Sequence, residues 1–527
     1  MRGGRVMKQS LRQSMAWLHT WAGLVPGWVL YVIFVFGSAA FFQHEIDAWM
    51  RPELPSETRV SPRAFASADA VLRARAAGAE SWSVSLPDAR GGSALDVSWQ
   101  MPGQGRREAT RITLDPATGA EIPVRETRGG FFLYRFHFDL HFISVMWARY
   151  LVCVAAMAML VAILSGVVTH KKIFTDFFML RFRKGQRSWL DAHNVTAVLA
   201  LPFHLMITYT GLATLLFTLM PWAISANFPD RQAFYATTYP QGPEREASGE
   251  ATPVAPIGQM IAKAQGQWGG AMPTYLSIEN PGDKAAMATL YTAKSEWGNG
   301  RSDTVYLDAT NAALLPSTPA TPGRATATHR VMVDLHTAWF AGYGLRWLYF
   351  LSGLGGVAMA ATGLCLWCVK RRLKLPDPSR PHFGFRLVER LNIGFITGAP
   401  IGIAIYFLAN RLLPVAMARH ADWEINALFI AWGGTLVWAF LRQPRRAWLE
   451  TLTAAATLYA AIPLINAATT PRGLAPSLMA GDWTFASFDL VMLALAAGFA
   501  FTGWTLARHK PRQIPARKRR SGGEATA

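Results

Sequence analysis

About eight stretches of roughly 20 apolar residues run through this chain, and they constrain its fold more than any other feature. They cover residues 18–42, 143–169, 194–220, 346–369, 391–413, 425–441, 447–466 and 486–507. A helix of about 20 residues is long enough to cross a hydrocarbon core of about 30 Å. We therefore expect a polytopic α-helical membrane protein of about eight spans, and the first stretch is too long for a cleaved signal peptide.

The positive charge of the chain lies in short segments between these stretches. The chain has a net charge of +19, and its basic residues gather in 1–18, 170–190, 369–390, 442–446 and 508–520. The long regions 43–140 and 221–340 are close to charge-balanced. Because short basic loops stay in the cytoplasm, we expect both termini inside and the two long regions outside. This placement argues against nucleic acid as a partner and favours contact with membrane lipid.

The chain repeats the order apolar helix, polar region, apolar helix. In each polar region a short helix, at 64–77 or 255–266, precedes alternating segments that predict strands. The turn Asp115-Pro116-Ala117-Thr118-Gly119 fits the end of the first region. We expect two small α+β modules outside the membrane. The predicted units are 1–42 (N-terminus and first span), 43–140 (module 1), 141–220 (two spans and a basic loop), 221–335 (module 2), 336–390 (fourth span and loop), 391–507 (four-span bundle) and 508–527 (basic tail).

The last four predicted spans differ from the first four. They are joined by short loops, so neighbouring helices should pack antiparallel. Glycines at 394, 398, 402, 433 and 434 suit close helix contacts. No residue in these spans predicts a chemical role.

Four histidines occupy repeated places at the ends of apolar stretches. His19 and His193 each begin one, with Gly37 and Gly211 18 positions further on. His141 and His336 share the tripeptide Asp-Leu-His just before another stretch. Histidines in membrane spans are rare and face the protein interior. We expect His19 with His193 at the cytoplasmic side, and His141 with His336 at the outer side, to be axial ligands of two haem b groups.

Other histidines compete for these roles. They are His137, which shares a helix face with His141, His329, which shares one with His336, His170 after the second span, and His204 inside the third span. Zinc or copper is the alternative metal, held by clustered histidines on the outer face. Cys365 and Cys368 lack a following histidine, so we interpret them as buried, reduced thiols rather than a c-type haem site.

The motifs resemble those of the PepSY-associated transmembrane-helix family, also described as iron-regulated inner-membrane proteins. The resemblance covers about residues 10–375 and rests on Leu18-His19-Thr20-Trp21, Asp139-Leu140-His141, the loop from His170 to Phe182, Trp189-Leu190-Asp191-Ala192-His193, Leu201-Pro202-Phe203-His204, Asp334-Leu335-His336 and Leu364-Cys365-Leu366-Trp367. It implies PepSY-like outer modules, a bacterial inner membrane and a part in iron uptake, with some members resembling haem-containing reductases of ferric siderophores. Thr20 and Ala197 depart from the pattern, which usually has arginine and glycine there.

The sequence is therefore interpreted as a di-haem oxidoreductase. Electrons would enter at the cytoplasmic face and reduce a periplasmic acceptor, with Fe(III)-siderophore as the expected substrate. No Gly-x-Gly-x-x-Gly follows a predicted strand, so the electron donor would be a separate, unidentified molecule. Two other classes stay open. One is a periplasmic peptide- or protein-binding membrane protein without redox activity, and the other is a transporter, although no pair of broken helices with charged midplane residues stands out.

Overall fold

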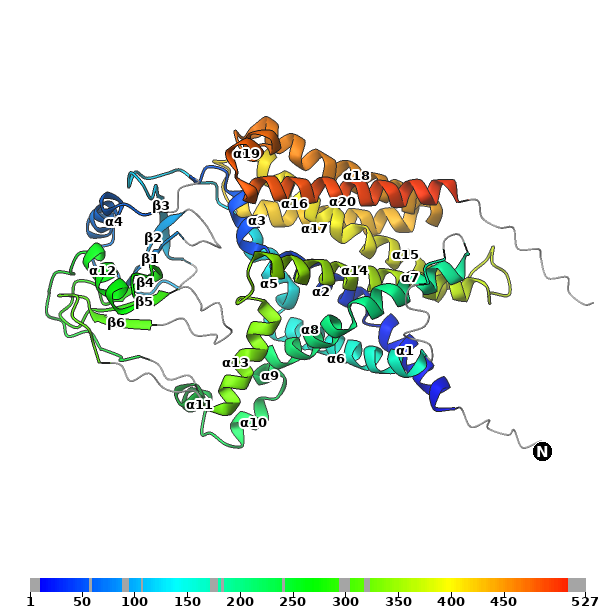
Figure 1. The fold of residues 1–527 in the computed structure, drawn as a ribbon, viewed down its shortest axis with the longest axis horizontal. Coiled ribbons are helices and arrows are strands. Elements are labelled where there is room, and N and C mark those ends of the chain that lie inside the picture. Colours follow the sequence, from blue (N-terminus) through cyan, green and yellow to red (C-terminus); the bar gives the residue numbers. More distant parts are fainter. Residues whose placement is uncertain are drawn as a thin grey trace, which may run out of the picture.

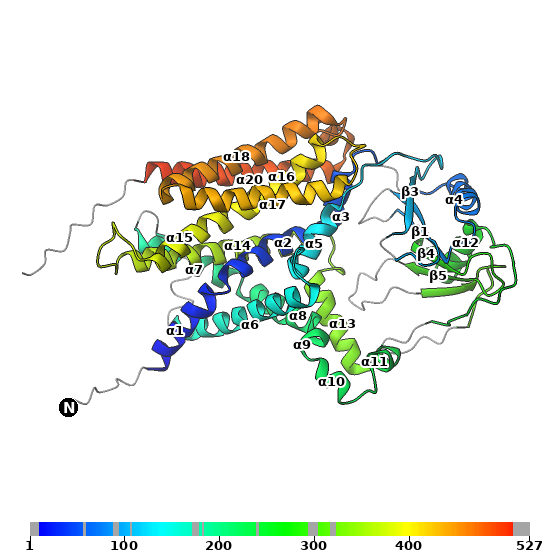
Figure 2. The same ribbon diagram turned by 180° about the vertical axis from the view of Figure 1, so that it is seen from behind.

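The computed structural model describes residues 10–55, 59–87, 94–105, 108–170, 179–181, 184–238, 242–292, 304–316 and 323–509. Parts of the basic segments predicted at 1–18, 170–190 and 508–520 lie outside these residues, namely 1–9, 171–178, 182–183 and 510–520. A long helical body carries a small α+β domain at one end (Figure 1). We call that end of the body the sheet end and the opposite one the far end. Both described termini, Ser10 and His509, lie at the far end (Figures 1 and 2).

The first half of the body consists of two similar sets of helices. The first set is α1 (Leu11–Leu24), α2 (Gly27–Ala40), α5 (Gly129–Asp139) and α6 (Val145–Thr169), and the second is α7 (Gln186–Leu199), α8 (Leu201–Thr214), α13 (Arg324–Thr337) and α14 (Tyr343–Arg372). Helix α1 packs on α6 and α7 on α14, whereas α2 packs on α5 and α8 on α13. The predicted repeat is therefore present as a repeat of helix pairs.

Two of the predicted spans are broken. Helices α1 and α2 meet at an angle of 60°, and α7 and α8 meet at 66°. Pro26 precedes α2 and Pro202 lies in the first turn of α8, where the missing N–H of proline ends the preceding helix. Among the described residues, six helices are long and apolar enough to cross a membrane, or up to eight spans are present if each bent pair counts as one. The chain is a multi-pass membrane protein.

The second half of the body is a bundle of longer helices. It contains α15 (Phe383–Ile396), α16 (Gly398–Leu412), α17 (His420–Leu441), α18 (Pro444–Thr469), the short α19 (Leu474–Ala480) and α20 (Trp483–Arg508). Glycines let α15 and α16 approach α17 closely, because an added Cβ would lie 2.3 Å from Leu436 at Gly394 and 2.6 Å from Trp432 at Gly398. Gly433 and Gly434 have open space around them, so their predicted contact role is wrong.

The α+β domain is built on one antiparallel sheet of six strands in the order β3-β2-β1-β4-β5-β6. The strands are β1 (Ser81–Ser85), β2 (Leu95–Gln100), β3 (Thr110–Leu114), β4 (Pro273–Glu279), β5 (Met287–Thr292) and β6 (Thr304–Asp308). Helices α4 (Pro62–Arg75) and α12 (Ile257–Gln267) cover the face turned away from the body (Figures 1 and 2). Alternation along the strands buries side chains such as Val84 and Leu276 against them.

The two predicted modules are thus halves of a single domain. Strands β1 and β4 pair in the centre, with Ser83 opposite Ser277, so each half contributes three strands and one helix. The predicted turn at 115–119 is present: Asp115 accepts backbone hydrogen bonds from Ala117 and Thr118, which lowers the pKa of its carboxyl, and Gly119 adopts φ 74°.

Short helices join the sheet to the body. They are α3 (Gln43–Met50), α9 (Leu216–Leu219), α10 (Pro221–Ser225) and α11 (Arg231–Thr238), besides α5 and α13. Helices α5 and α13 end alike, with Leu140 at φ 47° and Ala338 at φ 54° in the left-handed region. These ends determine which histidines the two helices present to the body.

Candidate functional site

Four imidazoles are held in the same way by the backbone of a neighbouring helix. Nδ1 lies 2.8 Å from the carbonyl oxygen of Ala162 for His19, 2.7 Å from that of Ile33 for His137, 2.9 Å from that of Met359 for His193, and 3.0 Å from that of Ile207 for His336. A carbonyl oxygen only accepts hydrogen bonds, so each Nδ1 carries the proton. The other ring nitrogen, Nε2, then keeps the lone pair that a metal ligand needs.

A glycine faces each of the four rings. Every carbonyl acceptor lies four residues before one: Ala162 before Gly166, Ile33 before Gly37, Met359 before Gly363, and Ile207 before Gly211. An added Cβ would lie 3.1, 2.5, 3.0 and 2.8 Å, in the same order, from Cε1 of the imidazole. Carbon atoms in contact stay about 3.5 Å apart or more. Glycine at these positions therefore leaves room for each imidazole to reach the carbonyl one turn earlier, most clearly at Gly37 and Gly211.

The rings meet in two pairs, one near each end of the body. His19 and His193 form the far-end pair, with 6.2 Å between ring centroids. His137 and His336 form the sheet-end pair, with 6.1 Å between centroids. The helices that carry them, α1 and α7 at one end and α5 and α13 at the other, are well separated in Figure 1.

This spacing fits one metal ion between the two rings of a pair. A metal–nitrogen bond of about 2 Å on each side, with about 1.1 Å from nitrogen to ring centre, gives roughly 6.2 Å between centroids. In the described part of the chain, no group of three or more histidine, cysteine or acidic side chains is arranged to hold a metal. A structural zinc site has four protein ligands and a catalytic one has three, so a pair of imidazoles better suits an ion whose remaining ligands come from a macrocycle.

The expected pairing of His141 with His336 is wrong, because His137 is the ring next to His336. Helix α5 ends at Asp139, and both Leu140 and His141 adopt the left-handed conformation. The His141 ring turns to the C-terminal bundle and stacks on Phe429, with centroids 5.9 Å apart and an interplanar angle of 11°. The residue His141 is exposed, but partial desolvation of its ring lowers the pKa of the imidazole.

A cavity of about 410 Å³ adjoins the sheet-end pair. Both rings line it, together with Gly37 and Gly211 and mostly apolar side chains of α2, α6 and α8. Arg135, Arg149 and Arg346 also line it. Arg149 bonds Asp139 at 3.0 Å and Arg346 pairs with Glu45 at 2.6 Å. An apolar slot with guanidinium groups on its wall suits a flat apolar ring system that bears carboxylates.

The remaining candidate histidines lie outside the two pairs. His204 is fully buried on α8, and its ring packs against Phe34 with centroids 5.7 Å apart. His170 ends α6 and its Nε2 lies 3.0 Å from Nδ2 of Asn194. His329 lies about two turns before His336 on α13, with Nε2 3.2 Å from the carbonyl oxygen of Ala213 and its ring 4.9 Å from that of Phe217.

The cysteines carry no metal ligand set. Cys365 and Cys368 are free thiols on α14, and Sγ of Cys368 accepts a hydrogen bond from Asn392 at 3.3 Å.

The four glycines that face the imidazoles are a signal present in the sequence. Gly37 and Gly211 were noted, but Gly166 and Gly363 complete the set and identify the two helices that hold the far-end pair.

Residues 16–370 match the PepSY-associated TM region, which is more than half of the chain. The chain belongs to this family. The chain is also similar to an uncharacterized protein of Pseudomonas aeruginosa. The two are 25% identical over 383 residues, which cover 68% of this chain and 91% of the relative. All four paired histidines of this family member, and all four facing glycines, lie inside the matched range, whereas α15–α20 lie beyond it.

Proposed function

We propose that this protein is a di-haem oxidoreductase that moves electrons across a bacterial inner membrane. One observation supports the proposal most strongly: the body holds two pairs of imidazoles, with ring centroids 6.2 and 6.1 Å apart, and each Nδ1 is bonded to a backbone carbonyl. Two such pairs on one helical body would hold two haems at different depths.

The chain's own residues bind and orient the cofactor. His19 and His193 would ligate the far-end haem, and His137 and His336 the sheet-end haem. The hydrogen bond from each Nδ1 to a carbonyl fixes the tautomer and the ring angle, and it makes Nε2 a stronger electron donor. Bound haem supplies one-electron chemistry between Fe(III) and Fe(II). The mostly apolar lining of the sheet-end cavity would limit access of water to a bound haem, and Arg135, Arg149 and Arg346, which pair with Asp139 or Glu45, would add positive charge near its carboxylates.

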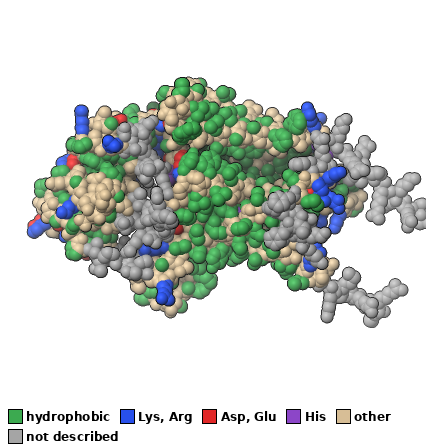
Figure 3. Space-filling model, in the orientation of Figure 1, with side chains coloured by type: hydrophobic (Ala, Val, Ile, Leu, Met, Phe, Trp, Pro, Cys, Tyr) green, Lys and Arg blue, Asp and Glu red, His purple; other side chains and the backbone are tan. Residues whose placement is uncertain are grey.

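The distribution of charge supports the direction of transfer. Hydrophobic side chains cover much of the helical body on the face seen in Figure 3, and Lys and Arg gather at the far end. Exposed examples there are Lys184, Lys370, Arg371, Arg445 and Arg446. By the positive-inside rule the far end faces the cytoplasm and the sheet end the periplasm. Electrons would then pass from a cytoplasmic donor to the far-end pair, then to the sheet-end pair and a periplasmic acceptor.

The acceptor we propose is Fe(III) in a siderophore. Hard oxygen ligands hold Fe(III) tightly and Fe(II) less so, because the charge on the ion falls. One-electron reduction would therefore release the iron. The polar face of the sheet is turned to the sheet end of the body, above the proposed site of reduction (Figure 1).

Optical spectroscopy of purified protein tests this proposal. We expect a Soret band that shifts on reduction with dithionite, and reoxidation of the reduced protein by a ferric trihydroxamate with Fe(II) captured by a chromogenic chelator. The His336→Ala variant is the matched control and should reoxidise much more slowly. A colourless wild-type protein would reject the proposal and favour a periplasmic peptide- or protein-binding membrane protein.

A further inference from the structure

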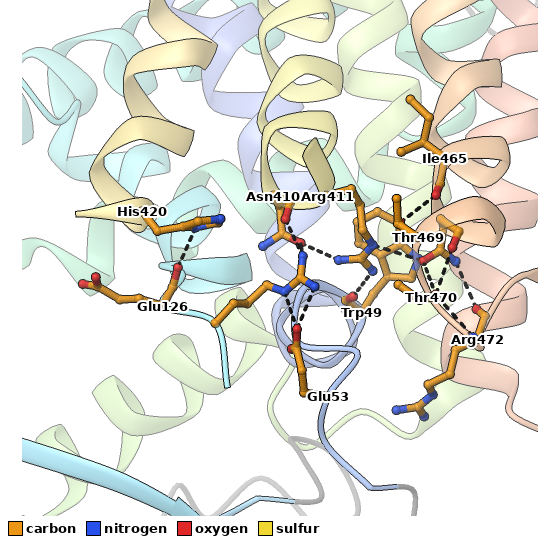
Figure 4. A network of polar contacts seen from close by, with 12 residues as sticks. Trp49, Glu53, Glu126, Asn410, Arg411, His420, Ile465, Thr469, Thr470 and Arg472 are labelled. Carbon is orange, nitrogen blue, oxygen red and sulfur yellow. Dashed lines mark hydrogen bonds and ion pairs between the residues drawn. The ribbon is translucent and has the colours of Figure 1, made fainter. Parts of the chain in front are cut away.

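The helices beyond the family match hold a buried polar network at the sheet end of their bundle. Asn410, Arg411, His420 and Glu424 are all at most 6% exposed. Figure 4 shows Asn410 and Arg411 close to Trp49 and Glu53, and His420 bonded to Glu126 beside them. Buried charged groups in membrane helices are costly and usually mark a function. In this bundle the network binds the two segments that connect the sheet to α2 and α5.

The segment just before α5 is bound most extensively. Thr127 donates to Glu424 at 2.6 Å, His420 Nδ1 bonds the carbonyl oxygen of Glu126 at 2.9 Å, and Tyr406 donates to the carbonyl oxygen of Gly129 at 2.9 Å. The guanidinium of Arg125 donates to the carbonyl oxygen of Asn410 and, at 2.8 Å, to Glu53. Every residue from 125 to 127, and the first residue of α5, therefore has a polar partner in or beside the bundle.

Apolar contacts extend the same attachment along α5. Phe132 packs on Tyr406 with ring centroids 5.4 Å apart, and Phe136 packs on Phe429 at the same distance. These side chains and Leu133 belong to one buried cluster shared with α16, α17 and α20. His137 follows Phe136 directly and points to α2 instead. Because α5 has only 11 residues, fixing its start and one face also fixes the ring of His137.

The helices that carry the other three paired histidines pack on other parts of the body. His336 lies on α13, which packs on α8. His19 and His193 lie on α1 and α7, which pack on α6 and α14. Those supports all belong to the part of the chain that matches the family. Helix α5 packs on α2 and α3 as well, but among the four helices that carry the paired histidines it is the one whose described side chains share a buried apolar cluster with α16 and α17.

We propose that the C-terminal bundle positions His137, and with it the sheet-end metal site, by holding residues 125–136 through Tyr406, Glu424 and their neighbours. This inference rests on the proposed function, since it assigns the four extra spans a role in placing one haem ligand. It gives Tyr406 and Glu424 a positioning role, with no contact to the cofactor.

Two conservative variants test the inference, and both keep the shape of the side chain. Tyr406→Phe removes the bond to Gly129, and Glu424→Gln removes the charge that Thr127 and Asn410 face. The control is Glu450→Gln, which removes a carboxylate of the same bundle that binds Trp438 and Arg442 elsewhere on it. Hydrogen exchange of the α5 amides should accelerate by about tenfold or more in both test variants, the size expected for one lost hydrogen bond to a buried partner, and stay unchanged in the control.

Electron paramagnetic resonance of the haem-loaded protein gives the second readout. The His336→Ala variant assigns the signals, because the low-spin signal that it loses is that of the sheet-end site. We expect this signal to shift or broaden in Tyr406→Phe and Glu424→Gln, and the signal of the far-end site to stay unchanged. Unchanged exchange of α5 together with two unchanged signals would overturn the inference and leave the proposed function intact. A wild-type protein without haem would instead reject the proposed function, and the exchange measurement would still decide whether the bundle positions α5.

Discussion

Replacing Gly37 by alanine should displace His137 and weaken the sheet-end site alone. The added Cβ would lie 2.5 Å from Cε1 and 2.6 Å from Nδ1 of His137. Restoring an ordinary contact of about 3.5 Å moves the ring by roughly 1 Å. The hydrogen bond from Nδ1 to Ile33, now 2.7 Å, would then open beyond about 3.5 Å and be lost.

The fold itself should tolerate this change. Gly37 lies inside α2, where alanine is a better helix former by about 1 kcal/mol. Loss of a partner that orients a metal ligand typically costs 10- to 100-fold in affinity, which is about 1.4–2.7 kcal/mol. We therefore expect normal expression and thermal stability, with haem affinity at the sheet-end site lowered by about 10- to 100-fold.

Haem titration of the apoprotein, followed by paramagnetic resonance, measures this effect. Gly434→Ala is the control, because its Cβ would meet nothing within 4 Å. Equal haem affinity and identical spectra in Gly37→Ala and wild type would refute the reasoning that the four glycines make room for ligating imidazoles.

Three further outcomes follow from the structure. His193→Ala should remove the far-end haem and leave the sheet-end one, whereas His204→Ala should keep both, as counted by pyridine haemochrome; the reverse result would transfer the ligand role to His204. Alkaline phosphatase fused after Gly119 should be active and fused after Lys374 inactive, and the opposite pattern would reverse the electron path. Backbone hydrogen bonds from Ala285, Ser248 and Gly249 lower the pKa of Asp283 from 3.8 to about 2. The ionised carboxylate therefore stabilises the folded protein fully above about pH 4, and this contribution is lost as the pH falls from about 4 to 2. In Asp283→Asn, the thermal unfolding temperature should not show this part of the fall at acid pH.

The positions of the helices could be predicted from the sequence because apolar length is a local property. The stretches predicted at 143–169 and 447–466 correspond to α6 and α18 within a few residues. The breaks near Pro26 and Pro202 could have been read from proline, but the bend of 60° or 66° depends on what each half packs against. The joining of both modules into one sheet had no local signal, since β1 and β4 are far apart in the chain.

The error in the sheet-end pair has a simple physical origin. Aligning the two Asp-Leu-His tripeptides sets His141 against His336, a separation of 336 − 141 = 195 positions. The structural repeat instead sets His137 against His336, a separation of 336 − 137 = 199 positions, which differs by four residues or about one helical turn. Helix α5 ends before His141, so the tripeptide match is out of register.

The most direct test of the central claim is the haem count of two neighbouring variants, His137→Ala and His141→Ala. Pyridine haemochrome assay on purified protein should give two haem b per chain for wild type and for His141→Ala, and one for His137→Ala, because only His137 faces His336 with Nδ1 bound to a carbonyl. Two haems retained in His137→Ala, or none in the wild type, would contradict the account.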